Sequence, residues 1–131
     1  MKDHTTEDFQ STVDAVLTRN KSLLDIISKC QQSMSGVERT IVKAVTNCGC
    51  VQIEGKRQNV PESASLTEMK TYMDNQVRGA LCPRCREVLD RELGKNLFYL
   101  FALCNTLDMD VYDVLTHEKE RLNTLGKYSL R

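Results

Sequence analysis

Apolar residues recur every three or four positions along most of the chain, which is the spacing of one face of an α-helix. The pattern predicts an all-α protein of about five helices. The longest apolar stripe lies in the fourth helix, so we expect this helix to form the centre of the core. By residue range, the expected helices are 5–30, 35–48, 65–79, 83–107 and 110–126.

Two of these helices carry a capping-box signal at their start. Ser35 and Ser65 each stand three residues before a glutamate, the spacing at which two side chains cap a helix N-terminus. The stripe of the first helix alternates steps of four and three residues when Asn20 is counted, as in a coiled-coil seam. A seam asparagine can fix the register or the number of partners. Alternatively, the helix turns Leu17 and Leu24 inward and leaves Asn20 at an edge.

Helical periodicity fails between residues 51 and 64. Residues 51–54 alternate apolar and polar side chains like a short strand or extended arm, and Pro61 closes the loop that follows. A pair of cysteines flanks this segment on each side, which makes it an insertion and not a linker between domains. We therefore expect residues 1–131 to form one helical domain, a size that suits a single core.

The charge balance bears on the partners that the chain can have. Eighteen basic and eighteen acidic residues cancel, and the chain has no tryptophan. Because the chain has no basic excess and only three Phe and four Tyr on which bases could stack, we do not expect nucleic acid as a partner. No apolar run approaches the roughly 20 residues of a membrane helix, and the N-terminal residues are polar. We expect a cytoplasmic protein with no membrane association.

The candidate chemistry lies in two tight cysteine pairs, Cys48-Gly49-Cys50 and Cys82-Pro83-Arg84-Cys85. These spacings are too short for a comfortable disulfide within a pair but suit two thiolates that hold one tetrahedral ion. We predict a structural zinc site that links the end of the second helix to the start of the fourth. Four thiolates leave no position for a catalytic water. The alternatives are an iron–sulfur cluster, a redox pair at Cys82 and Cys85, and thiols that bind no metal.

The fourth helix also carries a family resemblance. Residues 91–110 read RELGKNLFYLFALCNTLDMD. This stretch is similar to the segment E-E-L-G-D-x-L-x-Y-L-L-A-L-A-N-x-L-G-I-D of the MazG-like, all-α nucleotide pyrophosphohydrolases, and the resemblance continues into Val111 to Leu122. It implies a MazG-like helical bundle whose subunits pair through their helices, so we expect a homodimer or a larger homo-oligomer. A further, unknown protein partner is also consistent with it.

The resemblance breaks at the catalytic acids. The family holds Mg²⁺ with E-x-x-E and E-x-x-D motifs on two helices, because this ion prefers oxygen ligands. Glu92 matches the first acid of the second motif, but Lys95 stands where the aspartate should be. Glu38 stands alone on the other helix, and Glu87 and Asp90 lie too early in the sequence.

Three functions therefore remain open. The first is a zinc-stabilised interaction or regulatory module without catalysis. The second is a Mg²⁺-dependent nucleoside triphosphate pyrophosphohydrolase with a shifted site. The third is a zinc-containing, nucleic-acid-associated protein. The shifted site would use Glu38, Glu87, Asp90 and Glu92, and a basic patch would use Lys56, Arg57, Arg78, Arg84 and Arg86.

Overall fold

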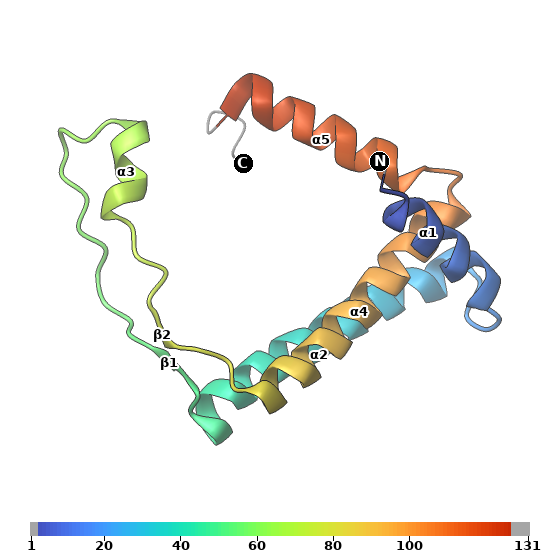
Figure 1. The fold of residues 1–131 in the computed structure, drawn as a ribbon, viewed down its shortest axis with the longest axis horizontal. Coiled ribbons are helices and arrows are strands. Elements are labelled where there is room, and N and C mark those ends of the chain that lie inside the picture. The colour runs from blue at the N-terminus through green and yellow to red at the C-terminus, as the bar shows by residue number, and fades with distance from the viewer. Residues whose placement is uncertain (1–2, 127–131) are drawn as a thin grey trace.

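The structure is a computed structural model that describes residues 3–126. Over this range it contains five α-helices and a two-stranded antiparallel sheet, so the predicted number of helices is confirmed (Figure 1). A π-helical turn, η1, continues α2 directly. The elements in chain order are α1 (Thr5–Val16), α2 (Leu23–Lys43), η1 (Ala44–Cys48), β1 (Val51–Ile53), α3 (Leu66–Tyr72), β2 (Val77–Gly79), α4 (Pro83–Thr106) and α5 (Val111–Leu125).

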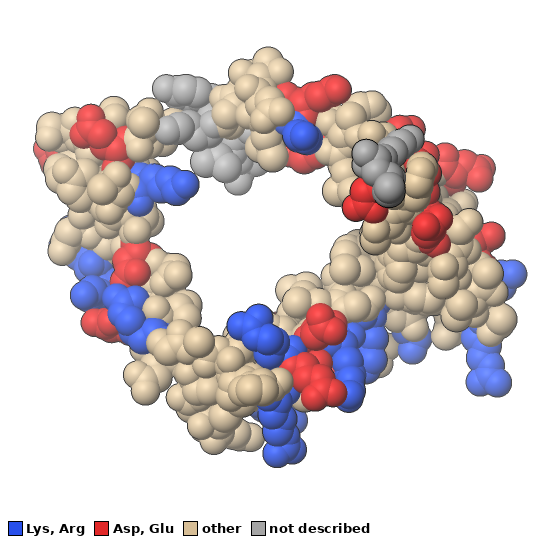
Figure 2. All heavy atoms as spheres, in the orientation of Figure 1, with Lys and Arg blue, Asp and Glu red and all other residues tan. Residues whose placement is uncertain are grey.

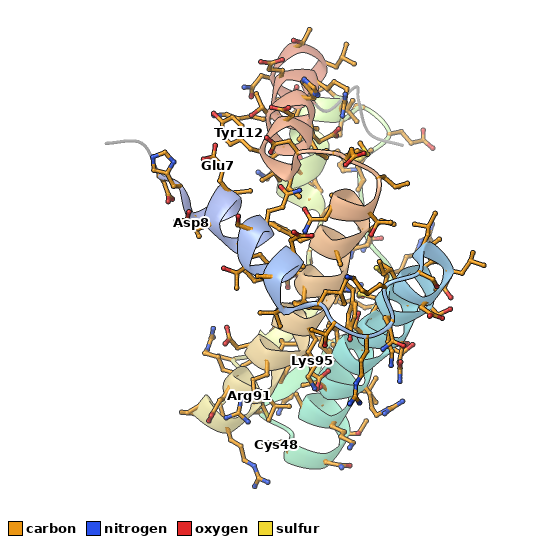
Figure 3. The ribbon with its side chains drawn as sticks, turned by 90° about the vertical axis from the view of Figure 1, so that its right-hand side faces the viewer. Glu7, Asp8, Cys48, Arg91, Lys95 and Tyr112 are labelled. Carbon is orange, nitrogen blue, oxygen red and sulfur yellow. The ribbon has the colours of Figure 1, made fainter. Side chains whose placement is uncertain are left out.

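The long helices α2 and α4 lie side by side and run antiparallel, and they form the α2–α4 hairpin on which the rest of the chain is built (Figure 1). Asn96 ties the two helices together, because its Nδ2 donates to the Cys30 carbonyl at 3.2 Å and to Ser33 Oγ at 3.0 Å. Helix α1 packs across α4 and also contacts α5, at the end of the hairpin opposite to Cys48 (Figure 3). This end holds the most tightly buried apolar cluster, Val13, Ile26 and Ala102, with Phe9, Leu17, Cys30, Phe98, Phe101 and Leu103 packed around it.

The predicted first helix is wrong, because the chain breaks between Val16 and Leu23. Asn20 adopts a left-handed backbone conformation with φ of 54°, which asparagine tolerates better than most residues. Ser22 then caps α2 by accepting a hydrogen bond from the Asp25 backbone N–H at 3.1 Å. Asn20 therefore lies in a turn and in no helical seam. The helical spacing of apolar residues continues from α1 into α2 without a gap, so the spacing contains no sign of the turn.

The predicted helix start at Ser35 is also wrong. Helix α2 runs without interruption from Leu23 to Lys43, so Ser35 and Gly36 lie inside it. Gly36 faces α4, where a Cβ would lie 2.6 Å from the carboxylate oxygen Oε2 of Glu92. A capping-box spacing is weaker than the continuous apolar face that holds α2 against α4.

The segment between the cysteine pairs forms an arm that projects from the base of the hairpin (Figure 1). The strand predicted near Val51 is confirmed as β1. The helix predicted to reach Gly79 stops at Tyr72, and residues 77–79 pair instead with β1, with Val51 opposite Gly79. Arg78 secures this pairing through ion pairs with Glu54 at 2.6 Å and Asp74 at 2.7 Å. The arm and α3 bury little, and no residue of α3 is buried.

Helices α4 and α5 begin where the sequence predicted. Pro83 opens α4, and the Asp110 side chain caps α5 by accepting from the Tyr112 backbone N–H at 2.8 Å. The expected burial of α4 is only partly observed, because Leu93 and Leu97 are about half exposed. No helix within residues 3–126 is long and apolar enough to cross a membrane.

The chain exposes more surface than its size requires. Its solvent-accessible surface is 10233 Å². Compact monomers of 14.9 kDa expose roughly 7,000 Å². The excess is therefore about 3,200 Å². Many large apolar side chains on the helices are among the exposed residues. In space-filling view the arm, the hairpin and α5 surround an open centre (Figure 2).

Candidate metal centre

The four cysteines of the two pairs come together at the base of the hairpin, as the sequence predicted. Cys48 ends the π-helical turn, Cys50 precedes β1, Cys82 is the N-cap of α4 and Cys85 lies in its first turn. Their sulfur atoms all lie within 4.8 Å of one another. Cys48 and Cys82, which are 34 positions apart in sequence, are thus brought into direct contact.

Two glycines allow this convergence. Gly49 has φ of 76°, which lets the chain reverse between Cys48 and Cys50. Its backbone N–H donates to the Ala44 carbonyl at 2.9 Å. Gly79 has φ of 79°, and a Cβ there would lie 2.5 Å from the Cys50 carbonyl oxygen. The close approach of β2 to Cys50 therefore requires glycine at position 79.

The sulfur positions fit one tetrahedral ion. Zn–S bonds of about 2.3 Å at tetrahedral angles place neighbouring sulfurs about 3.8 Å apart. The Sγ atoms of Cys48 and Cys82 are separated by 3.8 Å, and the widest spacing in the cluster is 4.8 Å. A contraction of about 1 Å at most would complete the tetrahedron. All six cysteines are free thiols, so no disulfide competes for these sulfurs.

Hydrogen bonds within the cluster shift the pKa values of Cys82 and Cys85 in opposite directions. The pKa of Cys82 is lowered to about 7, first because the Cys85 backbone N–H donates to its sulfur at 3.4 Å and then because the Cys85 thiol donates as well. The pKa of Cys85 is raised to about 12, chiefly because its proton is held in that hydrogen bond. A thiolate at Cys82 surrounded by three other sulfurs is an attractive site for a cation.

The other two cysteines lie outside this centre. Cys30 packs against the apolar cluster at the far end of the hairpin, and Cys104 is partly buried on α4. Desolvation raises the pKa of both thiols. Both cysteines therefore occupy positions typical of small apolar side chains.

The acids of the alternative magnesium site do not converge. Glu87 forms an exposed ion pair with Arg91, and Glu38 and Asp90 are exposed. Glu92 lies against α2, where Lys95 Nζ approaches its Oε1 at 3.3 Å. Within residues 3–126, the four cysteines are the one set of three or more Cys, His, Asp or Glu side chains placed to hold an ion.

The basic patch of the nucleic-acid alternative does not form as expected. Lys56 and Arg78 both pair with Glu54, at 3.6 Å and 2.6 Å, and Arg78 also pairs with Asp74 at 2.7 Å. Two acids therefore balance these two cations within the arm. Arg84 is the member of the predicted patch that lines a groove.

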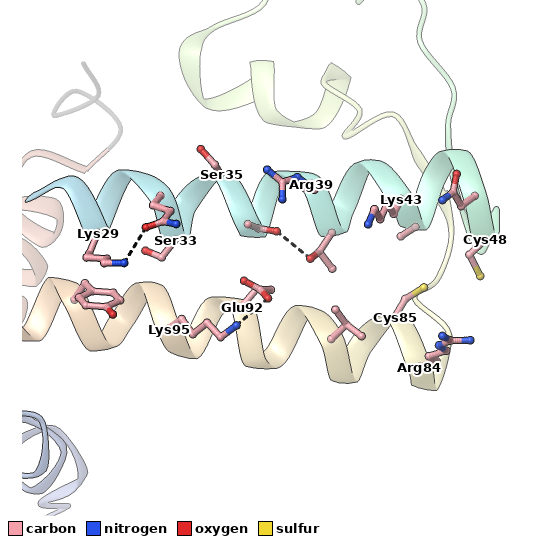
Figure 4. A pocket seen from close by; sticks show the side chains of 17 residues that line it. Lys29, Ser33, Ser35, Arg39, Lys43, Cys48, Arg84, Cys85, Glu92 and Lys95 are labelled. Carbon is pink, nitrogen blue, oxygen red and sulfur yellow. Dashed lines mark hydrogen bonds and ion pairs between the residues drawn. The ribbon is translucent and has the colours of Figure 1, made fainter. Parts of the chain in front are cut away.

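This groove is the feature that the sequence analysis missed. It is an open hollow of about 1160 Å³ along one side of the α2–α4 hairpin, and it ends at the cysteine cluster (Figure 4). The sequence of α2 does contain a sign of the groove. Lys29, Gly36 and Lys43 recur every seven residues and therefore lie on one face of the helix. The basic side chains that line the groove are Lys29, Arg39, Lys43, Arg84 and Lys95.

Comparisons with protein-family models, with curated proteins and with solved structures found no match to this chain.

Proposed function

We propose that this chain is a zinc-stabilised helical interaction module that self-associates through the α2–α4 hairpin and performs no catalysis of its own. The observation that carries the proposal is an apolar seam on the hairpin. We define the apolar seam by six side chains that are each 40–53% exposed: Ile27, Met34, Ile41, Leu93, Leu97 and Leu100.

The seam has the spacing of a helix–helix interface. On α2 its members recur every seven residues, and on α4 they alternate steps of four and three, as in coiled coils. On α2, the seam residues Ile27 and Met34 each directly follow a buried residue, Ile26 and Ser33. One position is a rotation of about 100°, so the seam lies beside the α2–α4 contact on the side away from the groove.

The exposed area supports a second copy of the chain as the occupant of the seam. Obligate homodimers bury about 2,000–5,000 Å² in total and are more apolar than transient complexes. The excess of about 3,200 Å² is spread over the whole chain, and the half-exposed apolar seam is the part of it that suits such an interface. Two hairpins packed seam to seam would form a four-helix bundle, which also agrees with the resemblance of residues 91–110 to MazG-like proteins.

The cysteine cluster supports zinc as the ion. Four thiolates at tetrahedral spacing match a structural zinc site, and such a site closes coordination without a water ligand. A multi-iron cluster needs room for bridging sulfides between its cysteines, and the sulfur spacing of 4.8 Å or less favours a single ion. The role of the ion would be to hold the end of α2 against the start of α4.

The surroundings of Glu92 support the absence of catalysis. The enzyme alternative needs several carboxylates around Mg²⁺. Glu92 instead faces a lysine, and its nearest acidic neighbours in sequence point elsewhere along α4. A cation in this position would oppose metal binding by its charge.

The oligomeric state of zinc-loaded protein tests the proposal. We expect analytical ultracentrifugation to give a dimer or a larger assembly at micromolar concentration. Leu97→Glu should shift it towards monomer, because it buries a charge in the seam. Leu24→Glu is the matched control, since Leu24 is 76% exposed on α2 and lies outside the seam. A wild-type monomer at high concentration would refute self-association.

A second assay separates the module from the enzyme. Folded protein with verified zinc content would be incubated with nucleoside triphosphates and Mg²⁺ or Mn²⁺. The module predicts no release of pyrophosphate. Turnover that disappears in Glu92→Gln would establish the pyrophosphohydrolase in place of the module.

A further inference from the structure

The groove beside the α2–α4 contact has a strong positive charge although the chain is neutral. Five basic side chains and one acid, Glu92, line it. Among the described residues no ion pair engages Lys29, Arg39, Lys43 or Arg84, whereas Lys95 pairs with Glu92 at 3.3 Å. The compensating acids gather around α1 and the start of α5 at the other end of the molecule (Figure 2). Lys29 donates to Gln32 Oε1 at 3.2 Å, a neutral acceptor that leaves its charge unbalanced. These four cations have no acidic partner among the described residues and are available to an external anion.

The cations are distributed along the groove and are not focused on one point (Figure 4). On α2 the lining runs from Lys29 to Cys48, which corresponds to about 28 Å of helix. Lys29 lies near Tyr99 and Lys95 at one end, and Lys43 and Arg84 lie near the cysteines at the other. A compact anion would contact only part of this row. An extended anion with repeated charges would contact all of it.

Neutralisation of the metal centre explains only part of the row. Four thiolates around Zn²⁺ carry a formal net charge of about −2. Lys43 and Arg84 are close enough to balance this charge. Lys29 lies 14 residues before Lys43, about 21 Å along the helix, and charges at that distance are screened at physiological salt. The charge of the metal centre therefore does not account for Lys29 at the far end of the groove.

We propose that the groove binds an extended chain of phosphate groups, such as the sugar–phosphate backbone of single-stranded nucleic acid. The inference goes beyond the proposed module, and it depends on an intact hairpin but not on self-association. Phosphate chains match a row of separated cations, because each phosphate can contact one Lys or Arg. Tyr99 in the groove wall offers one ring on which a base can stack.

Glu92 gives the proposal a distinctive test. Its carboxylate lines the groove beside Gly36, where a Cβ would lie 2.6 Å from Glu92 Oε2. There it pairs with Lys95 and repels other anions. Glu92→Gln should remove this internal competitor and strengthen phosphate binding several-fold. The enzyme alternative predicts loss of function for the same substitution, so the two hypotheses differ in sign.

The experiment measures fluorescence anisotropy of a labelled, mixed-sequence single-stranded oligonucleotide with zinc-loaded protein over a series of salt concentrations. Single strands release counterions with a slope of about 0.7 per contacted phosphate. Lys29→Gln combined with Arg39→Gln should therefore reduce the slope of log affinity against log salt by about 1.4. Lys70→Gln combined with Lys119→Gln is the matched control, because it changes the net charge equally outside the groove. Circular dichroism and zinc content verify that each variant is folded.

The outcomes are distinct. Binding that weakens in the groove variant and not in the control supports the proposal. Absence of binding at low salt, or equal weakening in both double variants, overturns it. Inorganic polyphosphate serves as competitor. Equal competition assigns recognition to the phosphate chain alone, and weaker competition shows that the bases contribute. A monomeric protein that still binds would refute self-association and leave this inference intact.

Discussion

Replacing Cys85 with serine should destabilise the fold, and the length of the loop between the two cysteine pairs sets the size of the effect. An ion held by all four cysteines joins Cys50 to Cys82 across 31 intervening residues. The loop-closure entropy of a cross-link over this length corresponds to about 4 kcal/mol at 25 °C. The β1–β2 pairing already restricts part of the loop, whereas the metal–sulfur bonds add stability of their own. We therefore expect complete removal of the ion to cost about 4 kcal/mol, or roughly 12–16 °C in Tm. Cys85→Ser leaves three thiolate ligands and should cost up to this amount.

The assay is thermal unfolding followed by circular dichroism, with metal content measured on the same samples by mass spectrometry. Wild-type protein, chelated protein and Cys85→Ser would be compared at one protein concentration, because self-association makes Tm concentration-dependent. Cys104→Ser is the matched control, since it makes the same chemical change at a partly buried cysteine outside the cluster. It should retain one zinc ion per chain.

The reasoning fails if verified removal of the metal leaves Tm unchanged. It also fails if Cys104→Ser lowers the metal content as much as Cys85→Ser does. In the first case the cluster would not connect α2 to α4 energetically. In the second the measured metal would not be bound at the four cysteines.

Three further predictions follow from local geometry. Gly79→Ala should lower both stability and zinc affinity, because its Cβ would meet the Cys50 carbonyl oxygen; urea unfolding and competition with a zinc chelator measure the two effects. Asn96→Ala should cost about 1–2 kcal/mol in urea unfolding, since it removes two hydrogen bonds between α2 and α4. The hydrogen bond from Arg78 lowers the pKa of Asp74 below its ordinary value of 3.8, so its contribution to the arm is complete above pH 3.8 and is lost as pH falls through the lowered value. Hydrogen exchange of the β1 and β2 amides should therefore become faster, relative to its intrinsic rate, only in strong acid.

The sequence was sufficient wherever a short local signal decided the structure. The two cysteine pairs predicted the cluster. One or two residues between the cysteines of a pair bring both sulfurs within reach of the same ion. The starts of α4 and α5 were predicted for a similar reason, since Pro83 and Asp110 act within a single helical turn.

Features that depend on contacts between distant residues were not accessible in this way. The turn around Asn20 interrupts a helical pattern that continues on both sides, and nothing in the spacing reveals the break. Strand β2 exists because it pairs with β1, which lies 24 or more residues earlier. The groove joins cations of α2 to cations of α4, so it appears only once the register between these helices is known.

The arm between the two cysteine pairs has a consequence for how the chain can vary. Both of its ends meet at the cysteine cluster, and its outer part packs on none of the long helices to a significant extent. Doubling the length of such a loop costs only about 0.6 kcal/mol in closure entropy. The arm is therefore a site at which a foreign peptide or a reporter can be inserted between β1 and β2. Such an insertion should leave the structure of the hairpin and its groove unchanged.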